Sequence, residues 1–157
     1  MELNHNHFMK KALQEANYAF FKDEVPVGCV IVHNNEIISR SSNMVELLND
    51  STAHAELIAI TSAQNNLNSK NLENCTLYST LEPCSHHGKT PPCTNAIIKN
   101  KVKRVYYSIE DKDVRSFNKT KKILKSKNII AKSGLQKNKV NKLYKEYNLS
   151  LIHISEP

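Results

Sequence analysis

The clearest pattern near the start of the chain is a set of apolar residues at helical spacing between residues 8 and 21. Met9, Leu13, Ala16 and Phe20 recur every three or four positions, with polar residues between them. This spacing places apolar side chains on one face of an α-helix. The chain is therefore predicted to open with an amphipathic helix over residues 8–21.

Two short apolar runs follow, over residues 27–32 and 36–41, and they flank the sequence His33-Asn34-Asn35. Runs of this length are typical of strands. Asparagine tolerates the left-handed backbone that a tight hairpin turn requires. The pattern therefore predicts a β-hairpin.

Further elements alternate through the rest of the chain. The pattern predicts helices over residues 53–65, 94–100, 117–127 and 137–149, and strands over 75–80, 104–109 and 129–132. Residues 49–52 (Asn-Asp-Ser-Thr) offer capping side chains before the first of these helices. Residues 82–92 contain three prolines and are predicted to form a loop.

Strands that alternate with helices need crossover connections, which give parallel strand pairs. The elements therefore predict an α/β fold, a three-layer sandwich with a five-stranded mixed sheet. No repeat or linker divides it, so we expect one domain over residues 1–149. Residues 150–157 (SLIHISEP) resemble a translated sequencing adapter, and we expect a non-native tail there.

Composition is ordinary for a globular protein, with 39% apolar and 24% charged residues in 157. No apolar run approaches the ~20 residues that a membrane helix needs, and no signal peptide is visible, so we expect a cytoplasmic protein without membrane contact. The formal charge of +7 is uneven, because residues 1–83 carry 5 basic and 10 acidic residues, whereas residues 84–157 carry 17 and 5. Solvated helix faces explain most of the later lysines, with a phosphate-binding surface as the alternative.

The four cysteines fall into two kinds. Cys29 and Cys75 lie in predicted strands, where a free cysteine acts as a small buried apolar residue. Cys84 and Cys93 lie beside prolines in a polar loop, which is an unusual place for such a residue. The second pair is therefore a candidate for chemistry.

Two further polar residues, His54 and Glu56, stand near the start of a predicted helix. A catalytic zinc site takes three protein ligands and a water, and one histidine with two cysteines supplies that number. Bound zinc lowers the pKa of water to about 7, and a neighbouring carboxylate can move its protons. Each piece alone also fits a structural role, such as a zinc knuckle, but the combination indicates a zinc-dependent deaminase.

The same residues carry a resemblance to the cytidine-deaminase superfamily, whose pattern is H-x-E…P-C-x-x-C. The resemblance implies a cytidine-deaminase-like fold and one zinc ion per chain. It implies that His54, Cys84 and Cys93 are the metal ligands and that Glu56 is the catalytic acid and base. The chain departs from the pattern because eight residues, instead of two, separate the cysteines.

The second half of the chain, residues 84–135, resembles the deaminase of riboflavin biosynthesis, above all in the ten residues from Cys84 to Cys93 (CSHHGKTPPC). This likeness implies a ribosylated, phosphorylated diaminopyrimidinone as substrate. His86, Lys89 and Thr90 are then placed to reach its sugar or phosphate groups. Alternatively, these three residues only order the loop.

The first half, residues 7–83, instead resembles the tRNA adenosine deaminase that makes inosine at the wobble position. The matching stretches include residues 24–28 (EVPVG), 50–56 (DSTAHAE) and 76–84 (TLYSTLEPC). In that family the residue that matches Asn43 contacts the flipped base. Because the change between the two likenesses coincides with the step in charge, a recombined or mis-assembled reading frame is a further hypothesis.

The sequence thus leaves three functions open. The main expectation is deamination of the riboflavin-pathway aminopyrimidine, because the inter-cysteine residues lie beside the metal. The alternative is deamination of tRNA adenosine at the wobble position, with tRNA as the partner. The third is a folded zinc module without turnover, because mismatched halves misplace the substrate. Both resembled families form oligomers, so we expect a homo-oligomer.

Overall fold

The computed structural model describes residues 4–88, 90–113 and 115–155. Its helices are α1 (His5–Phe21), α2 (Val45–Leu48), α3 (Ala55–Leu67), α4 (Cys93–Lys99), α5 (Thr120–Ser126) and α6 (Lys137–Ser155). Its strands are β1 (Gly28–His33), β2 (Glu36–Ser42), β3 (Cys75–Leu81), β4 (Arg104–Ile109) and β5 (Ile130–Ser133).

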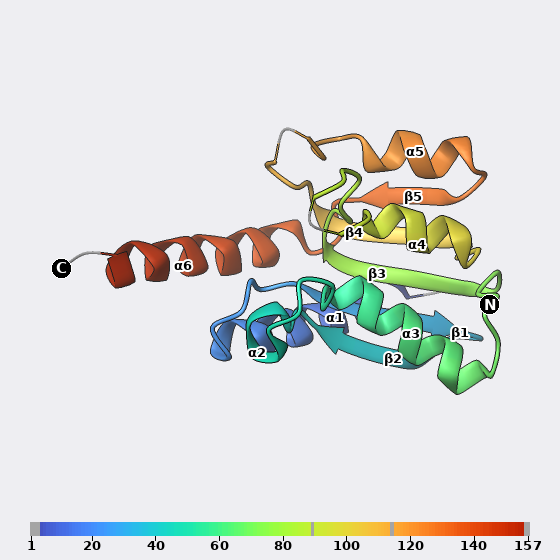
Figure 1. Cartoon of the computed structure of the whole chain (residues 1–157), viewed down its shortest axis with the longest axis horizontal. Coiled ribbons are helices and arrows are strands. Elements are labelled where there is room, and N and C mark those ends of the chain that lie inside the picture. The colour runs from blue at the N-terminus through green and yellow to red at the C-terminus, as the bar shows by residue number, and fades with distance from the viewer. Residues whose placement is uncertain (1–3, 89, 114, 156–157) are drawn as a thin grey trace.

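The strands form one sheet in the order β2-β1-β3-β4-β5 (Figure 1). β1 is antiparallel to β2 and β3, whereas β3–β4 and β4–β5 are parallel. α3, α4 and α5 cover one face, and α1 packs on the other, where α6 contacts β4 and then extends beyond the sheet. The expectation of an α/β sandwich with a five-stranded mixed sheet is confirmed.

The β1–β2 hairpin turns at Asn34 and Asn35, whose φ angles are 51° and 65°. Two successive left-handed residues are typical of the type I′ turn, which matches the twist of the flanking strands. The predicted hairpin is confirmed.

Alternate residues of the central strands enter two separate apolar clusters. Cys29, Ile31 and Leu77 belong to the cluster beneath α3, α4 and α5. Val30 and Tyr78 belong to the cluster beneath α1. Because a strand places successive side chains on opposite faces, a sheet covered on both faces needs apolar residues at nearly every position. Cys29 and Cys75 are fully buried, as predicted.

Several boundaries differ from the predicted ones. The helix expected from residue 53 begins at Ala55, with His54 as its N-cap and no side-chain cap. Asp50 does not cap it, because its Oδ1 accepts hydrogen bonds from the Thr52 amide and hydroxyl and forms a local turn. The helix expected from residue 117 begins at Thr120, and α6 runs to Ser155 instead of residue 149. α2 was not predicted.

No helix among the described residues is both long and apolar enough to cross a bilayer.

Candidate metal and catalytic site

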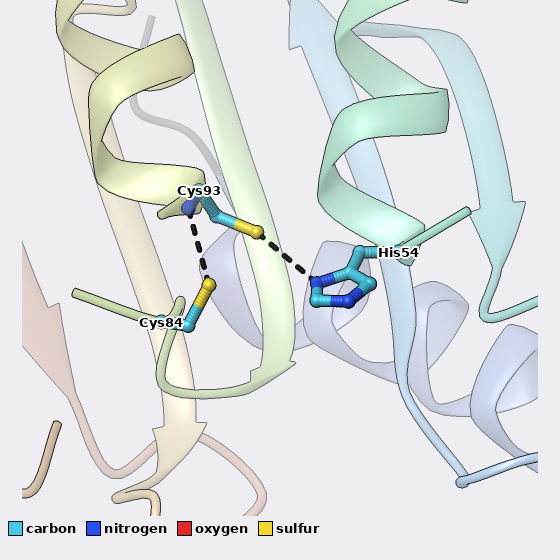
Figure 2. Close-up of side chains that lie close together, drawn as sticks. All are labelled: His54, Cys84 and Cys93. Carbon is cyan, nitrogen blue, oxygen red and sulfur yellow. Dashed lines mark hydrogen bonds between the residues drawn. The ribbon is translucent and has the colours of Figure 1, made fainter. Parts of the chain in front are cut away.

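Three residues from separate segments meet at the ends of β3, α3 and α4 (Figure 2). His54 directly precedes α3, Cys84 follows the end of β3 by three residues, and Cys93 is the first residue of α4. One ligand atom from each lies within 4.8 Å of the others. The three residues expected to be ligands therefore converge.

The contacts within this triad show which atoms face its centre. The Cys93 amide donates a hydrogen bond to Cys84 Sγ at 3.1 Å, and Cys93 Sγ lies 3.6 Å from His54 Nδ1. His54 thus presents Nδ1 to the sulfurs, which the sequence did not reveal. Two thiolates and an imidazole at this separation are the donor set of a tetrahedral zinc site that keeps one position for water.

The electrostatics of the triad favour a bound cation. Hydrogen bonds from Cys93 and His54 lower the pKa of Cys84 to about 4, so Cys84 is a thiolate. The hydrogen bond to Cys84, together with burial, raises the pKa of Cys93 well above its ordinary value. A divalent zinc ion would balance the charge of two thiolates at this separation, so the residues present fit the metal.

Glu56 lies beside the triad in the first turn of α3 and is 5% exposed. Burial raises the pKa of this carboxyl group, and a hydrogen bond from Ser79 opposes the rise. Ser79 Oγ lies 2.7 Å from Glu56 Oε1 and 2.8 Å from the Leu81 carbonyl oxygen. A buried carboxyl group with a raised pKa beside the metal ligands is suited to proton transfer.

A cavity of about 470 Å³ opens over the triad and Glu56. Asn43, which is 8% exposed, lines one side of it, and His86 and Thr90 line another. The structure thus brings three of the four expected substrate-binding residues to the cavity. The fourth, Lys89, lies outside the described residues.

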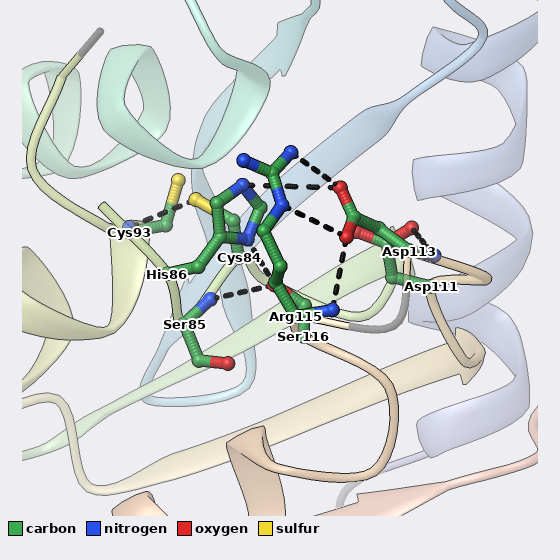
Figure 3. A network of polar contacts seen from close by, with 8 residues as sticks. All are labelled: Cys84, Ser85, His86, Cys93, Asp111, Asp113, Arg115 and Ser116. Atoms are coloured by element: carbon green, nitrogen blue, oxygen red, sulfur yellow. Dashed lines mark hydrogen bonds and ion pairs between the residues drawn. The ribbon is translucent and has the colours of Figure 1, made fainter. Parts of the chain in front are cut away.

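His86 is held by the protein itself (Figure 3). Its Nδ1 lies 2.5 Å from Ser116 Oγ, and its Nε2 lies 4.0 Å from Asp113 Oδ2. Arg115 donates two side-chain hydrogen bonds to Asp113, at 3.0 and 2.7 Å, and holds the pKa of that carboxyl group well below its ordinary value.

Sequence reasoning missed several polar residues in the cavity lining and behind it, among them Glu24, Ser79, Glu82 and Ser116. Glu24 and Glu82 are buried carboxylates in the cavity lining. Glu82 carried a signal, since it stands beside Cys84 in the Leu-Glu-Pro-Cys segment that both resembled families share. The roles of Glu24, Ser79 and Ser116 depend on contacts with residues far away in the chain, and no local sequence pattern encodes such contacts.

A family model described as the cytidine and deoxycytidylate deaminase zinc-binding region matches residues 2–109 and so includes the whole triad. The chain belongs to this family. The deaminase is therefore a zinc-dependent hydrolase that acts on C–N bonds, and its His/Cys/Cys triad is compatible with zinc.

Curated relatives of this deaminase are tRNA-specific adenosine deaminases. The protein of Aquifex aeolicus is 49% identical over 106 residues, which cover 68% of this chain and 66% of that protein. The protein of Buchnera aphidicola is 36% identical over 145 residues, covering 90% of this chain and 92% of that protein. A solved structure of a tRNA:A34 deaminase has a TM-score of 0.74 at 35% identity and covers 87% of this chain and 98% of its own.

These relatives overturn the main expectation of a riboflavin-pathway substrate, which is wrong. A solved diaminohydroxyphosphoribosylaminopyrimidine deaminase/reductase from Thermotoga maritima has a TM-score of 0.73 at 34% identity, and the match covers 88% of this chain and 38% of that one. The expectation gave most weight to the ten residues from Cys84 to Cys93. Those residues form one loop, whereas the likeness to a tRNA-specific adenosine deaminase extends over 145 residues.

Proposed function

We propose that this deaminase hydrolytically removes the 6-amino group of an adenosine at the wobble position of tRNA, which leaves inosine in the tRNA and releases ammonia. The observation that carries the proposal is the alignment with a tRNA-specific adenosine deaminase over 92% of that protein's length. The chain spans about two thirds of several other relatives, among them the Aquifex protein. A cytoplasmic location, where tRNA is found, is part of the proposal.

We assign the metal to the triad, with His54 Nδ1 and the thiolates of Cys84 and Cys93 as ligands. The support is the approach of one ligand atom from each residue to within 4.8 Å of the others, together with the lowered pKa of Cys84. When bound, zinc supplies a water molecule acidified to a pKa of about 7.

Glu56 then moves the protons of the reaction. Its carboxylate takes one proton from the attacking water and delivers it to the ring nitrogen N1. It then takes the second proton of that water, now on the oxygen bound to C6, and delivers it to the departing amine. One water is consumed and one ammonia is released, so the atoms balance.

Ser79 suits both forms of Glu56, because its hydroxyl carries a single hydrogen and has two oxygen neighbours. It donates to the charged carboxylate, and it accepts from the neutral carboxyl group while donating to the Leu81 carbonyl oxygen. The site therefore needs no rearrangement as the proton moves.

Asn43 contacts the reacting base in this proposal. It is nearly buried and lines the same cavity as Glu56. A base inside a stacked loop cannot reach the bottom of a cavity, so the adenosine must be turned out of its stack. A cavity of about 470 Å³ is large enough for a single base and its sugar.

We also propose that the deaminase is a homo-oligomer. Leu47 and Leu48 of α2 are 60% and 54% exposed beside the cavity, and Phe21 at the end of α1 is 81% exposed. Exposed apolar side chains of this size are typical of surfaces that a partner covers. Light scattering of the purified protein tests this, and a monomeric mass at micromolar concentration contradicts it.

The deciding experiment uses zinc-loaded protein and a synthetic anticodon stem-loop with adenosine at the wobble position. We expect inosine in the digested RNA and an equal amount of ammonia. A stem-loop in which that adenosine is replaced by guanosine is the matched control and should release none. Ammonia from the ribosylated diaminopyrimidinone phosphate, with none from the stem-loop, overturns the proposal.

A further inference from the structure

The loop between Cys84 and Cys93 has no regular secondary structure, yet three of its described residues, His86, Gly88 and Thr90, line the cavity. Two of its residues, His86 and Thr90, face the substrate space. A loop of this kind positions a donor accurately only if another element holds it. The neighbouring segment, residues 110–113 and 115–120, provides that element.

This segment is fixed to the residues that follow β3 and lead to Cys84. Glu82, which is 2% exposed, accepts hydrogen bonds from the backbone amides of Asp111, Asn118 and Thr120 at 3.1, 3.3 and 3.2 Å. The Thr120 hydroxyl donates to the Pro83 carbonyl oxygen at 2.6 Å. A buried carboxylate with three amide donors makes the segment a rigid support for whatever it contacts.

Ser116 is the point where this support meets the loop (Figure 3). It is fully buried, and its Oγ accepts a hydrogen bond from the Ser85 amide at 3.2 Å. The same oxygen lies 2.5 Å from His86 Nδ1. One hydroxyl therefore contacts both the backbone and a side chain of the loop.

The direction of this hydrogen bond decides where the hydrogen of the imidazole lies. Within the described part of the chain, His86 Nδ1 is the acceptor in reach of the Ser116 hydroxyl hydrogen. If Nδ1 accepts, the hydrogen of a neutral imidazole must be on Nε2. Nε2 lies on the side of Asp113, which Arg115 holds in place.

We propose that Ser116 is a positioning residue that fastens the inter-cysteine loop and makes His86 an Nε2–H donor at the wall of the substrate cavity. The RNA group that receives this hydrogen bond is a sugar or phosphate oxygen next to the reacting base, which rests on the proposed function. Ser116 itself touches no substrate. Its effect is on substrate affinity, through His86.

The first test reads the tautomer and requires no substrate. Zinc-loaded protein labelled with ¹⁵N at histidine is examined by long-range ¹H–¹⁵N correlation, and we expect His86 to carry its hydrogen on Nε2. In Ser116→Ala the signal should change to a mixture of the two tautomers. Ser116→Thr, which keeps the hydroxyl, should restore the pattern of the unchanged protein.

The second test measures kcat and KM on the anticodon stem-loop. Loss of one positioned hydrogen bond in Ser116→Ala should raise KM roughly threefold to tenfold and leave kcat within about twofold. In the background of His86→Ala, the same substitution should have no further effect on KM, because the two residues act through one contact.

Ser108→Ala is the matched control. Ser108 is 1% exposed on β4, and its hydroxyl has no hydrogen-bond partner among the described residues. Ser108→Ala should keep the His86 tautomer, the KM for the stem-loop and the zinc content of the unchanged protein. Comparison with Ser116→Ala separates the loss of the fastening contact from the loss of any buried hydroxyl.

Three results would each overturn the inference. The first is a hydrogen on Nδ1 of His86 in the unchanged protein, and the second is an unchanged His86 tautomer in Ser116→Ala. The third is an effect of Ser116→Ala on KM that is equally large in the His86→Ala background. Failure of the proposed function would look different, because then neither the unchanged protein nor any variant would deaminate the stem-loop. The tautomer measurement needs no substrate and would still test the role of Ser116.

Discussion

The backbone amide of Cys93 donates a hydrogen bond to Cys84 Sγ at 3.1 Å, although eight residues separate the two cysteines. Cys93 begins α4, and amides at the start of a helix point away from its first turn and stabilise negative charge. The contact therefore stabilises the Cys84 thiolate from the side of the helix. The extra loop residues extend along the cavity and leave this geometry intact.

The first prediction concerns the metal. Cys84→Ser and Cys93→Ser should each reduce bound zinc from one ion per chain to well below it, because an alcohol at neutral pH is a poor zinc ligand compared with a thiolate. Elemental analysis of gel-filtered protein measures this. Cys75→Ala is the control, since Cys75 is fully buried in a strand and should leave the zinc content unchanged. A Cys93→Ser protein with full zinc content would refute the ligand assignment.

The second prediction concerns proton transfer. Glu56→Gln keeps the size of the side chain but removes its ability to accept a proton, so ammonia release should fall by at least about 10²-fold. Zinc content and the thermal midpoint of unfolding should be nearly unchanged. Glu36→Gln, at an exposed position on β2, should retain full activity. Equal, measurable rates for Glu56→Gln and the unchanged protein would mean that Glu56 does not carry the protons. No ammonia from either protein on any substrate would mean that the chain is a zinc module without turnover.

The third prediction concerns the support of Glu56. Ser79→Ala removes the hydroxyl that lies 2.7 Å from Glu56 Oε1. The carboxyl group then loses the partner that serves both of its protonation states, and kcat should fall about tenfold, with KM unchanged. Steady-state kinetics on the stem-loop measure both constants. A change in KM alone would place the role of Ser79 in binding, contrary to this prediction.

The strands and the convergence of His54, Cys84 and Cys93 are the parts of the structure that the sequence predicted well. The strand over residues 104–109 was predicted with its observed bounds, because a sheet covered on both faces gives a continuous apolar run. His54, Cys84 and Cys93 were predicted together because zinc chemistry restricts both the residue types and their number. For these parts, the local sequence pattern and the chemistry of zinc were sufficient for the prediction.

α2 shows what local pattern misses. Its four residues carry no helical repeat, and no side chain of its own caps it. The Glu24 carboxylate, about 20 residues earlier, accepts hydrogen bonds from the amides of Glu46 and Leu47. A helix stabilised by so distant a residue depends on tertiary contacts, and propensity alone does not reveal it.

The substrate was mispredicted for a related reason. The segment from Cys84 to Cys93 was treated as if it reported directly on the ligand, whereas its His86 is engaged by Ser116 within the protein. The likeness of ten residues in one loop reflects the geometry of that loop. Identity over the whole domain reports on the whole cavity, including Asn43 and Glu56, which come from the first half of the chain.

The fourth prediction follows from the cap on α2. Glu24→Gln replaces one of two acceptor oxygens with an NH₂ group that faces an amide donor, so the free energy of unfolding should fall by about 1–3 kcal/mol. Because α2 borders the cavity, KM should rise as well. Urea unfolding and kinetics measure the two effects. Asp23→Asn changes the neighbouring exposed carboxylate and should leave both the free energy of unfolding and KM unchanged.

The fifth prediction concerns Gly28, where β1 crosses α1. A Cβ atom at this position would lie 2.0 Å from the Ala12 carbonyl oxygen and 2.4 Å from the Ala16 amide nitrogen, and these backbone atoms of a helix cannot move aside independently. Gly28→Ala should therefore separate α1 from the sheet and cost several kcal/mol, in the range of severe overpacking.

Gly88→Ala is the matched control for stability, because the nearest heavy atom to its added Cβ would lie 4.0 Å away, at ordinary contact distance. Its thermal midpoint should equal that of the unchanged protein. Gly28→Ala should show a much lower midpoint or fail to yield folded, zinc-loaded protein. A normal midpoint for Gly28→Ala would mean that α1 packs farther from β1 than the structure places it, and the layer that covers the back of the sheet would then need revision.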